Sequence, residues 1–282
     1  MKTLGEVLKL STQYLQERQV SRARRCVEEL LADVLGLKRL DLYMQFDRPL
    51  DEKELAILRQ HLARRGKGEP LDYILKKTTF FNCILEISPA VLIPRPETEV
   101  LLDKVCSQLK KIPLEDKIAW DICSGSGCLG IGLKNFFPQL QVTLCDISPQ
   151  ALEIAKNNIF LNNLEIDTIQ GDLLSPFSGK KADIILCNPP YVSQADYMNL
   201  DREVKDFEPS LALVGGETGL EFYARLAKDL PSYLKPGAKI FFEIGSGQRE
   251  GVLDLFSASC WKCKVVERDW SGLDRFFFLE IE

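Results

Sequence analysis

The stretch Ile118–Gly130, IAWDICSGSGCLG, decides the fold of this 282-residue chain. Its first half is apolar apart from Asp121, as expected for a buried strand of a parallel sheet. Gly125, Gly127 and Gly130 follow in G-x-G-x-x-G spacing, which lets a ligand approach bare backbone at the start of a helix. The stretch therefore predicts a strand, a glycine loop and a helix that bind a nucleotide-type ligand.

Four predicted strands in residues 113–282 end in a polar side chain. In chain order these residues are Asp121, Asp146, Asp172 and Asn188. The carboxyl ends of parallel strands border the ligand crevice of an open α/β sheet, so these side chains should meet there. Asp146 follows the glycine loop by about 20 residues, where an acidic side chain accepts hydrogen bonds from a ribose. We therefore predict a doubly wound α/β domain, completed by an antiparallel edge hairpin at residues 264–268 and 275–281.

The stretch Asn188-Pro189-Pro190-Tyr191 comes directly after the apolar run Ile184–Cys187. Proline carries no N–H and fixes φ, so this turn should be stiff and poor in donors. The carbonyl oxygens of Asn188 and Pro189, and the Asn188 side-chain oxygen, can accept hydrogen bonds from a planar NH2 group. The Tyr191 ring would cover the face of that group. The stretch predicts a site for an amide or an exocyclic base amine; an ordinary strand-ending turn is the alternative.

The strand ends favour S-adenosylmethionine over NAD as the ligand. Asp121 places a carboxylate near the floor of the crevice, and Asp172 could meet an adenine amine. Histidine is absent from residues 113–282, whereas a hydride-transfer enzyme acting on an alcohol usually needs a proton carrier, although lysine or tyrosine can serve.

The composition limits which partners, metals and cellular location can be expected. Lys and Arg number 36 against 41 Asp and Glu, and a net charge of -5 argues against binding nucleic acid by bulk charge alone. The nine cysteines are scattered, and only Cys260 and Cys263 have metal-ligand spacing, far from the sole histidine, His61. We therefore expect no metal site. No apolar run approaches the roughly 20 residues of a membrane span, so a cytoplasmic protein is expected.

Residues 1–70 predict a small helical bundle. Apolar residues recur at helical spacing from Ser21, the expected N-cap, to Gly36, and again from Asp51 to Leu62. The arginines and lysine of these helices form either a solvated surface or a docking face. Residues 71–112 predict a linker with a β-hairpin at residues 79–87, followed by the stretch PRPETE, in which Arg95 either starts a helix or lines the mouth of the crevice.

With these residues in place, the whole chain resembles the release-factor glutamine N5-methyltransferases, the PrmC/HemK family of class I S-adenosylmethionine-dependent methyltransferases. The resemblance covers nearly the full length. Its motifs are Asp121–Gly127, Asn188–Tyr191, Pro94–Glu99, Glu69-Pro70 with Tyr73, and Glu208-Pro209. The Asn188 motif is shared with other amino-group methyltransferases, whereas PRPETE is specific to this family.

The resemblance implies a seven-stranded sheet that binds S-adenosylmethionine, and a substrate glutamine in a Gly-Gly-Gln loop of a release factor. The implied cofactor-binding residues are Asp121, Cys123, Ser124, Gly125, Ser126, Gly127, Asp146, Asp172, Leu173 and Asn188. The implied catalytic and substrate-binding residues are Asn188, Pro189, Pro190 and Tyr191, with Arg95 at the substrate. Residues 1–70 would recognise the release factor, and residues 113–282 would form the methyltransferase domain. Cys123 and Leu173 depart from the family pattern, in which glycine and an aromatic residue are frequent.

Two other functions fit parts of the sequence. A nucleic-acid methyltransferase acting on an exocyclic amine would meet the same planar NH2 group, with Tyr191 stacked on a flipped base. The charge balance and the lack of a base-reading module count against it. A cofactor-binding regulator without activity could also keep Asn188 and Tyr191.

Overall fold

The computed structural model describes residues 2–282 and contains two compact units. The first unit consists of the chain up to Lys76 together with Arg202–Phe207. The second consists of Lys77–Asp201 and Glu208–Glu282. The chain therefore leaves the second unit for a short stretch and returns to it. The expected assignment of residues 1–70 to substrate recognition stays a prediction.

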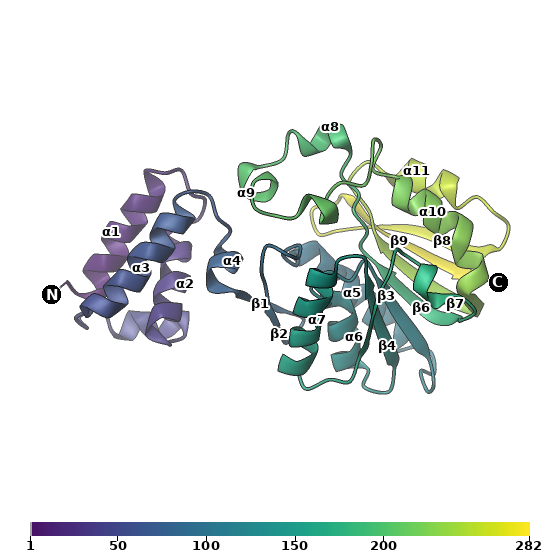
Figure 1. Ribbon diagram of the computed structural model, residues 1–282, viewed down its shortest axis with the longest axis horizontal. Coiled ribbons are helices and arrows are strands. Elements are labelled where there is room, and N and C mark those ends of the chain that lie inside the picture. Colours follow the sequence, from purple (N-terminus) through teal and green to yellow (C-terminus); the bar gives the residue numbers. More distant parts are fainter. Residues whose placement is uncertain (1) are drawn as a thin grey trace. The chain divides into compact units, whose positions relative to one another are not determined.

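The first unit is built from short helices around an apolar core (Figure 1). The helices that form this core are α1 (Leu4–Gln16), α2 (Ala23–Leu35), η1 (Arg39–Met44), α3 (Glu52–Arg65) and α4 (Leu71–Leu75). The short helix α9 (Arg202–Lys205) also belongs to this unit but has no buried residue. Asp51 caps α3 by accepting a hydrogen bond from the Glu54 N–H at 2.8 Å. The prediction of Ser21 as N-cap was wrong, because Arg22 holds that position with φ 50 and no side-chain hydrogen bond caps α2. Gly36 ends α2 as predicted, with φ 62.

Arg65 departs from the solvated basic face that the sequence suggested. Its guanidinium is buried and donates to the Glu203 carboxylate at 2.8 Å and to the Glu69 carbonyl at 2.8 Å. A buried arginine needs such acceptors, because an unpaired charge away from water is costly. Glu203 on α9 thus explains why a stretch distant in sequence belongs to the first unit.

The second unit contains the predicted seven-stranded sheet, in the order β5-β4-β3-β6-β7-β9-β8. The strands are β3 (Ile118–Ile122), β4 (Gln141–Asp146), β5 (Asp167–Gln170), β6 (Ala182–Cys187), β7 (Leu234–Glu243), β8 (Trp261–Arg268) and β9 (Asp274–Ile281). Strands β3 to β7 are parallel to one another, whereas β9 runs antiparallel to both β7 and β8. The predicted antiparallel hairpin at the sheet edge is confirmed. Strand order reverses between β3 and β6, which is where ligands bind in such sheets.

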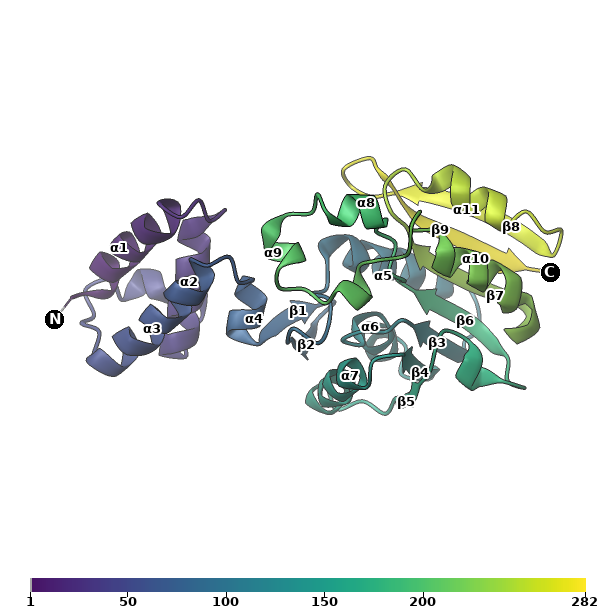
Figure 2. The ribbon, with the colours of Figure 1, turned by 45° about the horizontal axis from the view of Figure 1, so that its top comes forward.

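Helices cover both faces of this sheet (Figures 1 and 2). One face carries α5 (Pro96–Leu109), α6 (Cys128–Phe136) and α7 (Pro149–Leu161), and the other carries α10 (Glu221–Asp229) and α11 (Arg249–Leu255). Right-handed connections explain why both faces are covered. Helices α6 and α7 connect β3 to β4 and β4 to β5, which moves the chain toward one edge of the sheet, whereas α10 connects β6 to β7 and moves it toward the other edge. Trp120, Phe242 and Phe277 are buried in the core under α10 and α11.

The expected hairpin is present as β1 (Lys77–Phe80) and β2 (Cys83–Glu86). Asn158 of α7 and Asn162, the C-cap of that helix, attach the hairpin to the rest of the second unit. Asn162 accepts from the Ile84 N–H at 3.1 Å and donates to the Ile84 carbonyl at 2.8 Å, so it replaces a missing strand neighbour. Asn158, fully buried, does the same for Glu86 and also donates to the Ser126 carbonyl at 2.9 Å. The hairpin is thereby linked to the glycine loop.

Candidate active site

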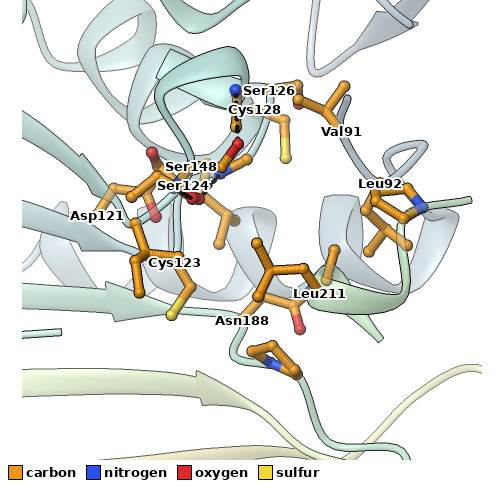
Figure 3. A pocket seen from close by; sticks show the side chains of 18 of the residues that line it. Val91, Leu92, Asp121, Cys123, Ser124, Ser126, Cys128, Ser148, Asn188 and Leu211 are labelled. Carbon is orange, nitrogen blue, oxygen red and sulfur yellow. Dashed lines mark hydrogen bonds between the residues drawn. The ribbon is translucent and has the colours of Figure 1, made fainter. Parts of the chain in front are cut away.

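A cavity of about 410 Å³ opens where the strand order reverses, at the carboxyl ends of β3 to β6. Its volume lies in the range of roughly 300–1,000 Å³ that is usual for small-molecule sites. Ten of the predicted site residues line it: Asp121, Cys123, Ser124, Gly125, Ser126, Asp146, Asp172, Leu173, Asn188 and Pro190. Figure 3 shows Asp121, Cys123 and Ser124 on one side, Val91 and Leu92 on another, and Asn188 beside Leu211.

The glycine loop takes its shape from backbone hydrogen bonds. The Gly125 N–H donates to the Asp146 carboxylate at 2.8 Å, and the Gly127 N–H donates to the Ser124 carbonyl at 2.7 Å. Gly127 does not line the cavity itself; it starts α6 with φ 81, and a Cβ there would lie 2.8 Å from Leu144. The left-handed backbone conformation favours glycine at this position.

Asp121 lies at the floor of the cavity and is almost fully buried. One carboxylate oxygen accepts a hydrogen bond from the Gly130 N–H at 2.8 Å, while the other has no partner among residues 2–282. Burial raises the pKa of Asp121 to about 7. The buried hydroxyl of Ser124 also lacks a partner within the described chain. Two such atoms beside a glycine loop fit the charged amino-acid portion of S-adenosylmethionine, which would satisfy them.

The next two acids differ in what surrounds them. Asp146 receives hydrogen bonds from the Gly125 N–H at 2.8 Å and the Ser148 N–H at 2.9 Å, and burial raises its pKa. Each oxygen keeps a further acceptor site for a ribose hydroxyl.

Asp172 is half-exposed and forms an ion pair with Arg225 at 2.6 Å. Its position at the rim suits the polar edge of an adenine, whereas the buried Leu173 offers an apolar surface.

The Asn188 side chain reaches the cavity from the end of β6. Its amide nitrogen donates to the Thr98 hydroxyl at 3.4 Å. Within residues 2–282, neither the Asn188 side-chain oxygen nor the Pro189 carbonyl oxygen takes part in a hydrogen bond. Both prolines are buried, and neither can donate. Asn188 and Pro190 line the cavity and Pro189 does not, so the binding of a planar NH2 group by both oxygens stays a prediction.

Tyr191 lies elsewhere than the sequence suggested. Its ring packs against the core rather than lining the cavity, and its hydroxyl donates to the Glu243 carboxylate at 3.2 Å. Burial raises the pKa of this hydroxyl, so it stays protonated. Tyr191 is thus held by Glu243 and by the core, and its contact with a ligand stays a prediction.

Residues far along the chain also hold the turn. The Gln248 side chain donates to the Tyr191 carbonyl at 2.9 Å, and Val192 forms a parallel bridge with Val214. A Cβ on Gly215 would lie 2.4 Å from the Pro190 carbonyl oxygen, so only glycine permits this approach. Sequence reasoning missed these residues, because nothing local around Gly215 or Gln248 points to the turn that they contact.

Arg95 does not line the cavity, although its neighbours Pro94 and Thr98 do. The Arg95 guanidinium forms an ion pair with Glu208 at 2.5 Å. Glu208 is buried and also accepts from the Ile93 N–H at 3.4 Å. This pair connects PRPETE with the segment whose residues Pro209 and Leu211 line the cavity. The Arg95–Glu208 ion pair thus links the motif Pro94–Glu99 to the motif Glu208-Pro209.

Among residues 2–282, no group of three or more His, Cys, Asp or Glu side chains is arranged to hold a metal ion. The same part of the chain contains no helix long and apolar enough to cross a membrane.

The sequence is 39% identical over 277 residues to the release factor glutamine methyltransferase of Chlamydia trachomatis, covering 98% of this chain and 94% of that protein. The chain belongs to the release factor glutamine methyltransferase family. The family member of Geobacter sulfurreducens is 38% identical over 97% of this chain and 95% of its own, and that of Bacillus cereus is 36% identical over 98% and 99%.

Two domain models agree with this family membership. A PrmC N-terminal domain matches residues 6–75, and a methyltransferase small domain matches residues 97–206. Among solved structures, a methyltransferase from Pyrococcus furiosus matches with a TM-score of 0.53 at 16% identity, covering 82% of this chain and 98% of that one. The 16S rRNA N2 G1207 methyltransferase of Thermus thermophilus, solved with AdoMet and guanosine, also gives 0.53 at 16% identity, over 73% and 50%. These likenesses confirm the class I methyltransferase fold of this family member.

Proposed function

We propose that this chain transfers a methyl group from S-adenosylmethionine to the side-chain amide nitrogen of the glutamine in the Gly-Gly-Gln loop of peptide chain release factors. The observation that supports the proposal is the turn Asn188–Tyr191, which reaches the cavity through Asn188 and Pro190 and carries two oxygens without a partner in the described chain. The free side-chain oxygen of Asn188 and the free carbonyl of Pro189 together match the two N–H groups of a primary amide.

An amide nitrogen is a poor nucleophile, because its lone pair is delocalised into the carbonyl group. The chain must therefore act mainly by positioning and by stabilising charge. If Asn188 and Pro189 each accept one N–H, the amide is held in one orientation, and positive charge that develops on its nitrogen is stabilised. No general base is required before the transfer.

The opposite side of the cavity would hold the cofactor, which supplies the methyl group when it is bound. Asp121 and Ser124 would contact its amino-acid portion, the loop through Gly127 would let it approach the backbone, and Asp146 would accept from the ribose. Asp172 and Leu173 would flank the adenine, with Cys123, Gly125, Ser126 and Asn188 completing the contact surface.

The substrate protein is expected to make further contacts with the first unit. A glycine-flanked glutamine is flexible enough to enter a deep site, whereas affinity for a whole protein needs a larger surface. The exposed apolar side chains of Leu40 and Met44 on η1 are candidates for it. We expect Leu40→Asp and Met44→Asp to lower activity on an intact release factor but not on a short Gly-Gly-Gln peptide. Equal losses on both substrates would mean that the first unit only supports the fold. A cytoplasmic location would follow from such a partner.

Mass spectrometry after incubation with isotope-labelled S-adenosylmethionine tests the proposal. The expected product is a release factor with one labelled methyl group on the glutamine of its Gly-Gly-Gln loop. DNA and RNA are included as rival substrates, because an exocyclic amine presents a similar NH2 group. Methylation of nucleic acid with none on the release factor would overturn the substrate class. Cofactor binding without any methylation would favour a regulator.

A further inference from the structure

A chain of three hydrogen-bonding side chains runs from the active-site turn into the sheet. The Asn188 amide nitrogen donates to the Thr98 hydroxyl at 3.4 Å, and that hydroxyl donates to the Glu243 carboxylate at 2.6 Å. Thr98 lies in the first turn of α5, and Glu243 is the last residue of β7. Both are almost fully buried, so water does not compete for these bonds.

The direction of this chain follows from the number of hydrogens that each group carries. A threonine hydroxyl has one hydrogen and two lone pairs, and a carboxylate can only accept. Because Thr98 gives its hydrogen to Glu243, its oxygen can only accept from Asn188. The amide nitrogen of Asn188 must then face Thr98, and its oxygen must face the other way. The two ends of an asparagine amide are nearly the same size, so only its hydrogen-bond partners fix the orientation.

Glu243 serves both ends of the turn. Its second oxygen accepts from the Tyr191 hydroxyl at 3.2 Å, while Tyr223 donates to its backbone carbonyl at 2.6 Å. Burial raises the pKa of Glu243, whereas the hydrogen bond from Thr98 and the charge of Arg275 oppose that rise. A single carboxylate therefore orders the side chains at the first and last positions of Asn188–Tyr191.

We propose that Glu243 is a positioning residue for methyl transfer, which acts through Thr98 to keep the side-chain oxygen of Asn188 turned toward the substrate amide. The inference rests on the proposed function, since it assigns a purpose to the orientation of Asn188. If the direction of the chain were reversed, Asn188 would present its NH2 group to the NH2 group of the substrate, and neither could accept.

Variants of Thr98 give the sharper test. Thr98→Val removes the hydroxyl at nearly constant volume, while Thr98→Ser keeps it. We expect the kcat of Thr98→Val on a Gly-Gly-Gln peptide to fall on the order of tenfold, the scale of one lost hydrogen bond. Thr98→Ser should restore most of the activity. The Kd for S-adenosylmethionine should stay within about twofold in both, which also shows that the variants are folded.

Glu243→Gln is expected to lower kcat as well, because a neutral amide accepts more weakly and can present its NH2 group to Thr98. Combining it with Thr98→Val should add little, since both changes interrupt the same chain. Glu280→Gln is the matched control, because it makes the same substitution in the same sheet on β9, in an ion pair with Lys239 and Lys262 away from the cavity.

The activity of the wild-type protein on the peptide distinguishes failure of the proposed glutamine methylation from failure of the positioning role of Glu243. Failure of the wild-type protein to methylate glutamine would overturn the proposed function. An active wild type with an equally active Thr98→Val variant would overturn the positioning role alone. So would additive losses in the double variant, or losses of kcat that are matched by losses of cofactor affinity.

Discussion

The glycine loop and the Asn188–Tyr191 turn follow neighbouring strands but offer a ligand different groups. The loop Ser124–Gly127 brings backbone N–H groups and glycine to the start of α6, whereas the turn has two prolines that cannot donate. The loop is bonded to Asp146, while the turn leaves Asn188 and Pro189 oxygens open. Within the described residues, the groups that stay unpartnered on the loop side are an Asp121 carboxylate oxygen and the Ser124 hydroxyl, which suit the amino group of a cofactor, whereas the open oxygens of the turn suit the NH2 group of a substrate.

Asn188→Ala should give the largest effect and should separate the two sides. Loss of one acceptor at the reacting group is expected to lower kcat by about 10²–10³. Cofactor affinity, measured by calorimetry on the same preparation, should change little, because most predicted cofactor contacts lie elsewhere. Asn135→Ala, on the exposed surface of α6, is the control. If rate and affinity fall together, Asn188 belongs to the cofactor side.

Asp146→Ala should affect the loop side instead. It removes the acceptor of the Gly125 and Ser148 N–H groups as well as the expected ribose contact. We expect the binding free energy of S-adenosylmethionine to weaken by about 1.5–3 kcal/mol, the range for a hydrogen bond to a charged group. Asp167→Ala, exposed on the neighbouring strand β5, should leave binding unchanged. Binding of NAD in place of S-adenosylmethionine would refute the cofactor assignment.

Asp121 makes the loop side sensitive to pH. Its pKa of about 7 means that it gains its negative charge between about pH 6 and pH 8. If only the ionised form holds the positively charged cofactor, affinity should rise about tenfold over that interval. Asp121→Asn should bind more weakly at pH 8 and show no such rise. A flat profile in the wild-type protein would contradict the contact.

The same pKa has the opposite effect on stability. Because the folded state raises the pKa from 3.8, it favours the protonated form, and this contribution is full below about pH 4 and lost by about pH 7. Denaturant unfolding should therefore show the wild-type protein losing stability relative to Asp121→Asn as the pH rises from 4 to 7.

Arg225→Ala should have the smallest effect. Its ion pair with Asp172 is half-exposed, and such pairs contribute about 0–1 kcal/mol. We expect the free energy of unfolding to change by less than about 1 kcal/mol, with a similarly small change in cofactor affinity. A large loss of affinity would show that Arg225, which also lines the cavity, contacts the cofactor directly.

Local sequence predicted most of the sheet and one side of the site. Asp121, Asp146, Asp172 and Asn188 could be placed together because parallel strands align their carboxyl ends, and the cavity brings all four together. Glu243 could not be predicted, since it was hidden in an apolar strand and bonds to Thr98, which lies 145 residues away in the sequence. The hydrogen bond from Tyr191 to Glu243 could not be predicted for the same reason. Contacts of this length depend on the finished fold rather than on any spacing in the chain.

The burial of Arg65 against Glu203 has a consequence for how this protein can be divided. A fragment that ends near Lys76 would carry the whole PrmC N-terminal match yet leave a guanidinium without its counter-charge. Conversely, a transplanted catalytic half would carry the stretch Arg202–Phe207 with nothing to hold it. A continuous N-terminal segment that is exchanged by recombination therefore lacks part of the unit that folds. A chimera of two family members would need the chain up to Lys76 and the stretch Arg202–Phe207 from the same parent.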